Sequence, residues 1–420
     1  MSTATGTVVS EFDQEVAPQS LKEGFGEYKA KLRGGDLGAL PAALGIVTLV
    51  IVFTLLRPET FPTAFNFANL INQSASIIVI AMGLVFVLLL GEIDLSAGFA
   101  AGTSAAMLAT TLTEWGWPWY FAVMASLVTG MVIGLSIGLL VARLGIPSFV
   151  VTLAAFLGLQ GLMLIIISEG GTIPIRNDVL LRIMNGQMPI WAGWALAFLI
   201  VGGYAAASYS KLARRKRHEL PTEGMRLWLA KVATLGVFIF GATAFLSQER
   251  SRNPDITSIK GVPWVVPVIL VLLVGLTYLL ERTAFGRHVY AVGGNSEAAR
   301  RAGIAVKNLR TVCFVMCSTL AGVAGILFAS RDNSVSPSTG GSTTLLFAVG
   351  AAVIGGTSLF GGRGRVRDAI LGGLVVAIIA NGMALLGQSA GVVFVVTGLV
   401  LLLAASVDAI SRRRAAAAGR

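Results

Sequence analysis

Runs of 18 or more apolar residues recur along this 420-residue chain, and they constrain the fold more than any other feature of the sequence. An apolar stretch of about 20 residues spans the hydrocarbon core of a bilayer as an α-helix. Hydrophobic residues make up 55% of the chain and charged residues only 13%, about half the charged share of an average soluble domain. The sequence therefore predicts an all-α, polytopic transmembrane helical bundle and excludes a single large soluble core. A transmembrane β-barrel is excluded as well, because its strands alternate in short segments.

Polar stretches divide the chain into three parts. Residues 1–38 are polar and mixed in charge, which predicts a flexible cytoplasmic N-terminal tail. Residues 39–409 are expected to form the transmembrane domain, and residues 410–420 a basic cytoplasmic tail. Twelve spans are expected, at about 40–56, 69–91, 95–113, 119–142, 147–168, 190–209, 227–247, 262–280, 311–330, 342–360, 368–387 and 390–409.

The basic residues lie in the loops, and their distribution predicts the orientation. The chain has a net charge of +11, but its Lys and Arg residues do not line one face of a folded domain, which argues against nucleic-acid binding. With twelve spans, 25 of the 32 Lys and Arg residues fall on the side that carries both termini. Cytoplasmic loops carry an excess of Lys and Arg, so both termini are predicted to be cytoplasmic.

The longest charged interruption in the second half of the chain is residues 281–310, with six Lys or Arg residues and two acids. Its middle, Ser296–Gly303, is predicted to be a helix of about two turns that begins at a serine cap and ends at a glycine. Glu297, Arg300 and Arg301 would form its polar surface. A simple turn between two spans does not need such a helix. The segment is therefore predicted to be a cytoplasmic loop on which another protein docks.

The motif GEIDLSAGF places Glu92, Asp94 and Ser96 between two expected spans, with almost no loop. A charged residue at the bilayer centre costs roughly 2.5–3.5 kcal/mol on insertion scales, so both acids are expected near the cytoplasmic end or in a polar cavity. One interpretation is a helix break that lines a transport pathway. The other is a helix cap, with Asp94 opening the next span. The two interpretations are compatible.

A few neutral polar residues lie inside the expected spans, among them Asn72, Gln73, Gln160 and Asn381. Such groups can hydrogen-bond a neutral polyhydroxylated solute without the cost of a buried charge, so they are candidates for the pathway. The alternative is that they join neighbouring helices by hydrogen bonds.

Several kinds of chemistry are missing from the sequence. There is no GxxxxGK[ST] phosphate loop, and His218 and His288 lie in different basic loops without a metal-spaced partner. Cys313 and Cys317 are four residues apart in one span and are interpreted as small core residues rather than a redox or metal site. The chain is therefore expected to bind no metal and no cofactor of its own. An ion-coupled secondary transporter of a small neutral solute stays an alternative, although titratable residues for a proton relay are nearly absent from the spans.

At this point the motifs resemble a known family, the permease subunits of bacterial ABC importers for simple sugars of the ribose, arabinose, galactose and xylose type. The extra pair of spans at about 190–247 is more similar to the longer xylose permeases than to the ten-span ribose type. The motifs that carry the resemblance are GEIDLSAGF, IPSFVVTLA from Ile146, RTAFGRHVYAVGGNSEAARRAGI, SPSTGG from Ser336, IGGTSLFGG and NGMALLG from Asn381.

The resemblance implies partners. They are a second permease copy, a cytoplasmic ATPase subunit with two nucleotide-binding halves, and an extracytoplasmic sugar-binding protein. It also implies that the EAAR helix docks in a cleft of the ATPase. ATP would be used by that subunit and not by this chain. The positions that carry this coupling role are Ser296, Glu297, Ala298, Ala299, Arg300, Arg301 and Gly303.

The chain departs from the family pattern at two places. Relatives often carry an arginine where this chain has Gln160, and acidic residues near Leu345 and Phe347. Acid and base are absent together. The hypothesis is that relatives hold an ion pair between these two spans and that this chain replaces it with a neutral contact, because removing one partner alone would strand a buried charge.

Overall fold

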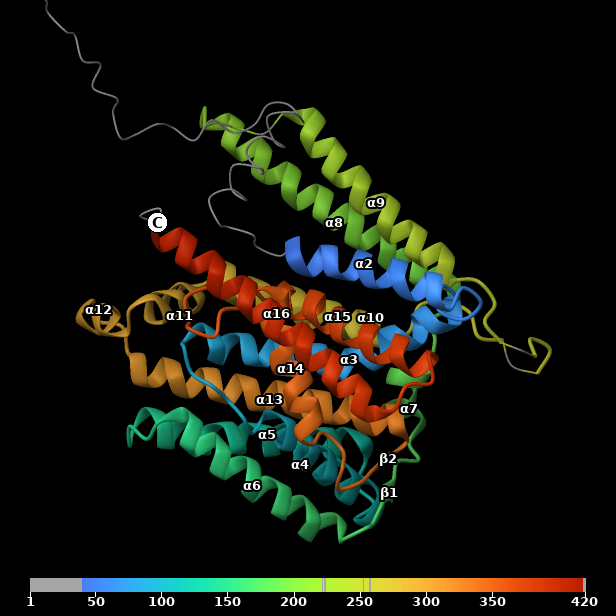
Figure 1. Ribbon diagram of the computed structural model, residues 1–420, viewed down its shortest axis with the longest axis horizontal. Helices are drawn as coiled ribbons and strands as arrows, with labels where there is room; N and C mark the ends of the chain where they lie inside the picture. Colours follow the sequence, from blue (N-terminus) through green and yellow to red (C-terminus); the bar gives the residue numbers. More distant parts are fainter. Residues whose placement is uncertain (1–39, 221, 223, 252, 257, 418–420) are drawn as a thin grey trace, which may run out of the picture. The chain divides into compact units, whose positions relative to one another are not determined.

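The computed structural model describes residues 40–417 except residues 221, 223, 252 and 257, and it is almost entirely helical in that part (Figure 1). The predicted class, a polytopic bundle of helices, is confirmed. The helices are α2 (Leu40–Leu56), α3 (Ala64–Leu89), α4 (Ala97–Ala109), the π-helical turn η1 (Thr110–Glu114), α5 (Trp119–Ala142), α6 (Ser148–Ile167), α7 (Asp178–Asn185), α8 (Ile190–Arg217), α9 (Met225–Leu246), α10 (Val265–Arg282), α11 (Ala284–Gly294), α12 (Ser296–Arg301), α13 (Val306–Asp332), α14 (Ser342–Gly355), α15 (Val366–Leu385) and α16 (Ala390–Ala417). The strands β1 (Ile173–Pro174) and β2 (Ser334–Val335) pair antiparallel.

Each of the twelve predicted spans coincides with a helix, but the helices differ in length. Eight of those in the described part are long and apolar enough to cross a membrane: α3, α5, α6, α8, α9, α10, α13 and α15. The helix α14 has 14 residues, or about 21 Å at 1.5 Å per residue, and α4 has 13 before it passes into η1. Both are shorter than the predicted spans 342–360 and 95–113. The number of spans and their orientation therefore stay predictions.

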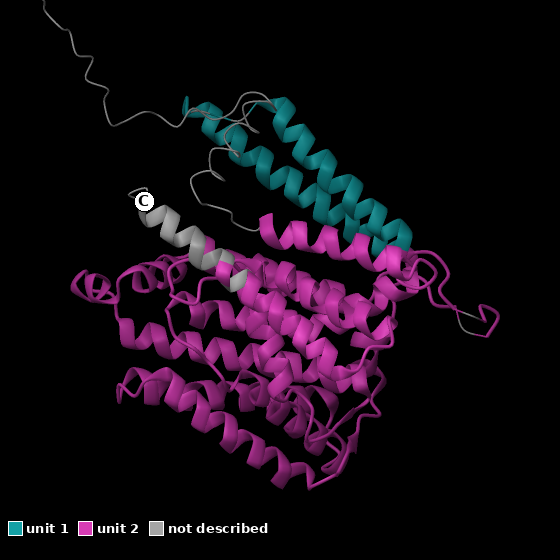
Figure 2. Cartoon of the chain, in the orientation of Figure 1, with its two compact units in different colours: residues 1–36, 191–245 teal, residues 37–190, 246–420 magenta. Residues whose placement is uncertain are grey.

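The chain divides into two compact units (Figure 2). The first contains residues 191–245, which form the α8–α9 hairpin. Within the hairpin, Trp194 stacks on Phe240 with ring centroids 6.1 Å apart, and the indole N–H of Trp228 donates to the Ser208 hydroxyl at 2.9 Å. The inserted pair of spans thus has its own packing contacts.

The second unit, residues 37–190 and 246–420, contains the other described helices. Its interior is built on α3 and α13, most of whose residues are buried, whereas few residues of α6 and α10 are buried. Small residues allow α13 to approach α5 closely: a side chain at Gly130 or Gly134 would meet the carbonyl oxygens of Ser318 and Phe314. Close backbone approach through small residues is typical of helix packing in membranes. Cys313 and Cys317 are buried and free on α13, as predicted for core residues.

The predicted tails fall mostly outside the described residues. The N-terminal tail, residues 1–38, is not described. The helix α16 continues to Ala417 and so includes most of the predicted basic tail at residues 410–420.

Candidate functional site

The charged segment 281–310 folds into two short helices, α11 and α12, between α10 and α13. The sequence predicted the second helix but not the first. The Thr283 side chain caps α11 by accepting a hydrogen bond from the N–H of Gly286 at 3.4 Å. Glycine is required at that position, because a side chain at Gly286 would overlap the Leu280 carbonyl oxygen at the end of α10.

The helix α12 confirms the predicted EAAR helix and corrects its cap. Asn295, not Ser296, is the N-cap residue: its Oδ1 accepts from the N–H groups of Glu297 at 3.1 Å and Ala298 at 2.9 Å. Asn295 has the extended backbone that an N-cap adopts, while Ser296 is already helical. The stop at Gly303 is confirmed, since its φ of +86° is a left-handed conformation that favours glycine.

The outer surface of α12 is charged and exposed. The Glu297 carboxylate accepts from the guanidinium groups of Arg300 at 2.8 Å and Arg301 at 3.1 Å, and these bonds hold its pKa below the usual value. The two arginine side chains are 69% and 78% exposed, which leaves most of their donors available to a partner. Ala299 is buried and forms the inner side of the helix. The arrangement suits an acidic or polar cleft of another protein.

The helix α11 fixes α12 to the body of the second unit. Phe285 of α11 contacts Phe86 of α3, with ring centroids 6.4 Å apart. The Tyr290 hydroxyl donates to the Gly364 carbonyl at 2.8 Å, in the loop that joins α14 to α15. A side chain at Gly293 would overlap the Leu89 carbonyl at the end of α3. The helix α11 therefore links α12 to both α3 and the α14–α15 loop.

The segment between α3 and α4, residues 90–96, is not helical, and we call it the break. Asp94 and Ser96 are fully buried in it. The Asp94 carboxylate accepts from the backbone N–H of Ser96 at 2.9 Å and from its hydroxyl at 2.6 Å, while the Cys317 thiol of α13 lies close enough to interact with it. The N-cap position of α4 belongs to Ser96, so the interpretation of Asp94 as the residue that opens the helix is wrong. Asp94 instead organises the break.

The polar backbone of the break is satisfied by side chains of α6. The N–H of Ile93 donates to the Ser148 hydroxyl at 3.3 Å. The Thr152 hydroxyl lies 3.2 Å from the Ile93 carbonyl and 2.9 Å from the Ser148 carbonyl of its own helix, and it donates to one of the two. Irregular backbone at membrane depth is stable only where protein or a polar cavity satisfies its N–H and C=O groups. The break is therefore an ordered connection.

An ion pair joins the break to α13. The Glu92 carboxylate lies 3.1 Å from Nε of Arg310, in the second turn of that helix. Its side chains are only 14% and 30% exposed. The structure therefore brings together two features that the sequence treated separately, the GEIDLSAGF motif and the charged segment 281–310.

The neutral polar candidates lie elsewhere. The Asn381 amide of α15 donates to the Gln73 side chain of α3 at 3.3 Å, and Asn72 donates to the Met184 carbonyl of α7 at 2.9 Å. These contacts support the interpretation that such groups join helices, and they place the two α3 residues near α15 and α7. Gln160 is exposed on α6 and does not share these contacts. Whether any of them lines the pathway stays a prediction.

The hypothesis of a neutral contact pairs Gln160 with Leu345 or Phe347, and both of these residues have other neighbours in the structure. Leu345 lies against Gly98 of α4, and Phe347 contacts Phe394 of α16 with ring centroids 6.3 Å apart. Replacement of an ion pair by a contact with Gln160 therefore stays a hypothesis.

The sequence predicted an outer loop at about residues 248–261 but not the hydrogen bonds that hold its described residues. The Glu249 carboxylate accepts from the N–H groups of Ser251 at 3.0 Å and Ile259 at 2.9 Å and from the Ser258 hydroxyl at 2.7 Å, and these bonds lower its pKa to about 2. The buried Arg250 guanidinium donates to the Gly261 carbonyl at 2.9 Å. A carboxylate followed by Arg and Ser was the only sequence signal, and by itself it is not specific.

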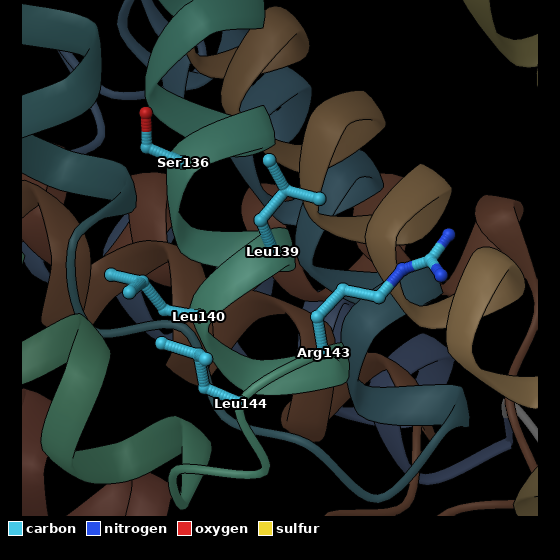
Figure 3. Close-up of a pocket in the computed structure, with 5 residues that line it drawn as sticks. All are labelled: Ser136, Leu139, Leu140, Arg143 and Leu144. Atoms are coloured by element: carbon cyan, nitrogen blue, oxygen red, sulfur yellow. The ribbon is translucent and has the colours of Figure 1, made fainter.

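A shallow hollow of about 400 Å³ lies at the end of α5, lined by Ser136, Leu139, Leu140, Arg143 and Leu144 (Figure 3). Figure 3 shows the Arg143 side chain extending away from Leu140 and Leu144. Its guanidinium donates to Asn308 of α13 at 2.8 Å. The leucines do not suit a polyhydroxylated solute, so we assign no substrate to the hollow.

No cluster of three or more metal-binding side chains occurs within the described residues.

Comparisons with known proteins find a permease family and two permease relatives. Residues 66–405 match the family described as branched-chain amino acid transport system / permease component. The chain is 33% identical over 383 residues to the xylose transport system permease protein of Escherichia coli (strain K12), which covers 91% of this chain and 94% of the relative. It is 32% identical over 376 residues to the ribose import permease protein of Bacillus subtilis (strain 168), covering 89% and 94%. No solved structure matches.

Proposed function

The chain belongs to the family of ABC transport permease components, and from this we propose that it is the membrane-spanning subunit of an ATP-driven importer that moves a simple sugar across the bacterial cytoplasmic membrane. The observation that carries the proposal is the capped, exposed helix α12, which α11 attaches to the end of α3. As a permease component, the chain is a transport subunit and not an enzyme.

Xylose or a similar monosaccharide is the proposed substrate. Two relatives that cover most of the chain are named for xylose and for ribose. Within the described spans, Asn72, Gln73 and Asn381 are neutral hydrogen-bonding groups, which suit hydroxyl groups better than they suit the charges of a free amino acid. The family description mentions branched-chain amino acids, so leucine is the appropriate competing substrate in a test.

Such a permease works with an ATPase and with a substrate-binding protein. We further propose that two copies of this chain assemble and that each presents α12 to a cleft of the ATPase. The coupling residues are Ser296, Glu297, Ala298, Ala299, Arg300, Arg301 and Gly303. This chain would bind no cofactor, and ATP would be used on the partner.

The proposed mechanism is alternating access driven by the partner. A loaded binding protein docks on the outer loops, including residues 169–189 and 248–261. ATP binding closes the two halves of the ATPase, and α12 moves with them. Since α12 is attached through α11 to α3 and to the α14–α15 loop, the movement changes the helix packing and exposes the sugar to the other side.

Co-purification followed by transport tests the proposal. The chain is expressed with candidate ATPases, and the complex is placed in proteoliposomes with a sugar-binding protein. Uptake of labelled xylose or ribose is expected to require ATP, while labelled leucine is not taken up. Uptake that follows a pH gradient without any ATPase would instead identify an ion-coupled secondary transporter.

The same preparation tests the role of α12. Glu297→Ala and Arg301→Ala are expected to weaken ATPase binding by about tenfold or more each, because hot-spot residues dominate such interfaces. Asp332→Asn, at the far end of α13, is the matched control. Unchanged ATPase binding in both α12 variants would contradict the docking role.

A further inference from the structure

The connection from α12 to α13 is short and hydrogen-bonded. Only residues 302–305 separate the two helices, and within them the N–H of Ile304 donates to the Ala299 carbonyl at 3.1 Å. The N–H of Val306, the first residue of α13, donates back to the Ile304 carbonyl at 2.9 Å. A displacement of α12 therefore moves the start of α13 as well.

At its start, α13 is bound to α5 and to the break. On one side, Asn308 accepts from Arg143 of α5 at 2.8 Å, and the Thr311 hydroxyl lies 3.3 Å from the Gly138 carbonyl as well as 3.1 Å from a carbonyl of its own helix. On the other side, Arg310 forms the ion pair with Glu92, which directly precedes the segment leading into α4. Of the ion pairs in the described part of the chain, only this one joins the charged segment 281–310 to the break.

The break is the part of the interior best suited to respond. Its backbone is irregular and lacks a helical ladder. The side chains of Glu92 and Asp94 contact α13, and side chains of α6 lie within hydrogen-bond distance of the Ile93 backbone. The helix α4 that follows it is buried along nearly its whole length, with Gly98 and Gly102 against the residues before α14. A displacement of Glu92 would therefore move the break and, through it, the short buried helix α4.

We infer that the Glu92–Arg310 pair transmits the movement of α12 to α4, and that these two side chains are positioning residues which couple ATP hydrolysis to opening of the path. The inference rests on the proposed function, because it assumes that an ATPase moves α12. It adds the residues through which the movement would reach the interior. Coupling between two distant sites is carried by an element with two arrangements, whose equilibrium both sites bias.

Neutral and exchanged variants test the inference. Glu92→Gln and Arg310→Gln are expected to keep ATPase co-purification and ATP hydrolysis, while the amount of sugar taken up per ATP falls by about tenfold or more, within the usual range of coupling between sites. Exchange of the charges, Glu92→Arg with Arg310→Glu, is expected to restore at least part of the ratio. Asp332→Asn, which removes an exposed pair at the other end of α13, is the control and should keep the ratio of the native chain.

The outcomes separate this inference from the proposed function. A native chain that neither binds an ATPase nor takes up sugar with ATP would end the proposed function itself. A native chain that does both, with unchanged uptake per ATP in both single variants, would overturn the inference alone. Loss of folded protein in the single variants and in the charge exchange, seen as aggregation on size exclusion, would assign the pair to stability and overturn it too.

Discussion

Gly293 lies where α11, the end of α3 and the α14–α15 loop meet. A Cβ atom there would overlap the Leu89 carbonyl and crowd the backbone of Gly362. Gly293→Ala is therefore expected to destabilise the folded chain by about 1–3 kcal/mol, the usual cost of overpacking, and to lower ATPase binding. Thermal unfolding in detergent measures the first effect and co-purification the second.

Gly294 provides a matched control, because a Cβ there has open space on all sides. Both residues lie at the end of α11, and both changes add the same methyl group. If Gly294→Ala lowers the unfolding temperature as much as Gly293→Ala does, close packing of α11 on α3 is not the reason for the loss.

The cap of α12 gives a second prediction at the scale of single residues. Asn295→Ala removes the acceptor of two backbone N–H groups and is expected to cost about 1 kcal/mol of helix stability. Hydrogen exchange at residues 297 and 298 should then speed up, and ATPase binding should weaken. Ser296→Ala should leave hydrogen exchange at these two residues unchanged, because its side chain does not cap the helix. Equal effects of the two substitutions would contradict the assigned cap.

Single residues also mark the limit of sequence reasoning. Asn and Ser are both good N-cap residues and stand next to each other here, so composition could not choose between them. The choice depends on the backbone angles, which are φ −158° and ψ 100° at Asn295. The same holds for Asp94, whose position two residues before the N-cap of α4 depends on how α6 holds the break.

At the scale of elements, a helix overlaps every predicted span, but α4 and α14 are shorter than the sequence predicted. The predicted span 342–360 runs on through the stretch IGGTSLF, yet α14 stops at Gly355. Gly356 has a φ of +120°, and a side chain at Gly355 would overlap the Asp368 carbonyl of α15. The glycine at residue 356 therefore ends α14, as Gly303 ends the α12 segment, and hydropathy alone does not register such a stop.

The outer loop 247–263 carries a prediction of its own. Glu249→Gln removes the charge that accepts hydrogen bonds from Ser251, Ser258 and Ile259, so faster hydrogen exchange is expected throughout the loop. Binding of the sugar-binding protein should weaken, since the loop is one of its proposed docking sites. Asp255→Asn, in the same loop, is the control. Unaltered exchange in Glu249→Gln would show that Arg250 alone orders the loop.

The pH dependence of this loop follows from the same carboxylate. The pKa of Glu249 lies at about 2, below the ordinary 4.5, because the folded loop favours the charged form. A lowered pKa stabilises the folded state above the ordinary value, and this contribution is lost as the pH falls through the folded value. Loop protection should therefore be equal at pH 7 and pH 5 and decline only between about pH 4.5 and pH 2. A decline already near pH 6 would point to another group.

For the whole molecule, the order of the helices along the chain could be predicted from the sequence, but the contacts between distant helices could not. Asn381 and Gln73 are 308 residues apart, and their contact depends on how α15 packs on α3. Glu92 and Arg310 meet for the same kind of reason, because α13 packs along α3 and its start lies near the segment that follows α3. Hydropathy and charge act along the chain, whereas these contacts arise from packing between distant segments.

The orientation of the whole chain is the remaining prediction, and the buried cysteines make it measurable. Cys313 and Cys317 are buried, so the native chain should not react with a membrane-impermeant maleimide. Introduced cysteines then report the side of the membrane on which they lie. Ile256→Cys, 80% exposed in the outer loop, should react in intact cells. His218→Cys, at the end of α8, and Arg301→Cys, on α12, should react only after the membrane is opened, because Lys and Arg residues gather on the cytoplasmic side. Reaction of His218→Cys in intact cells would place the α8–α9 turn outside and change the number of spans. Reaction of Arg301→Cys in intact cells would place α12 on the outer side of the membrane, where a cytoplasmic ATPase cannot bind it.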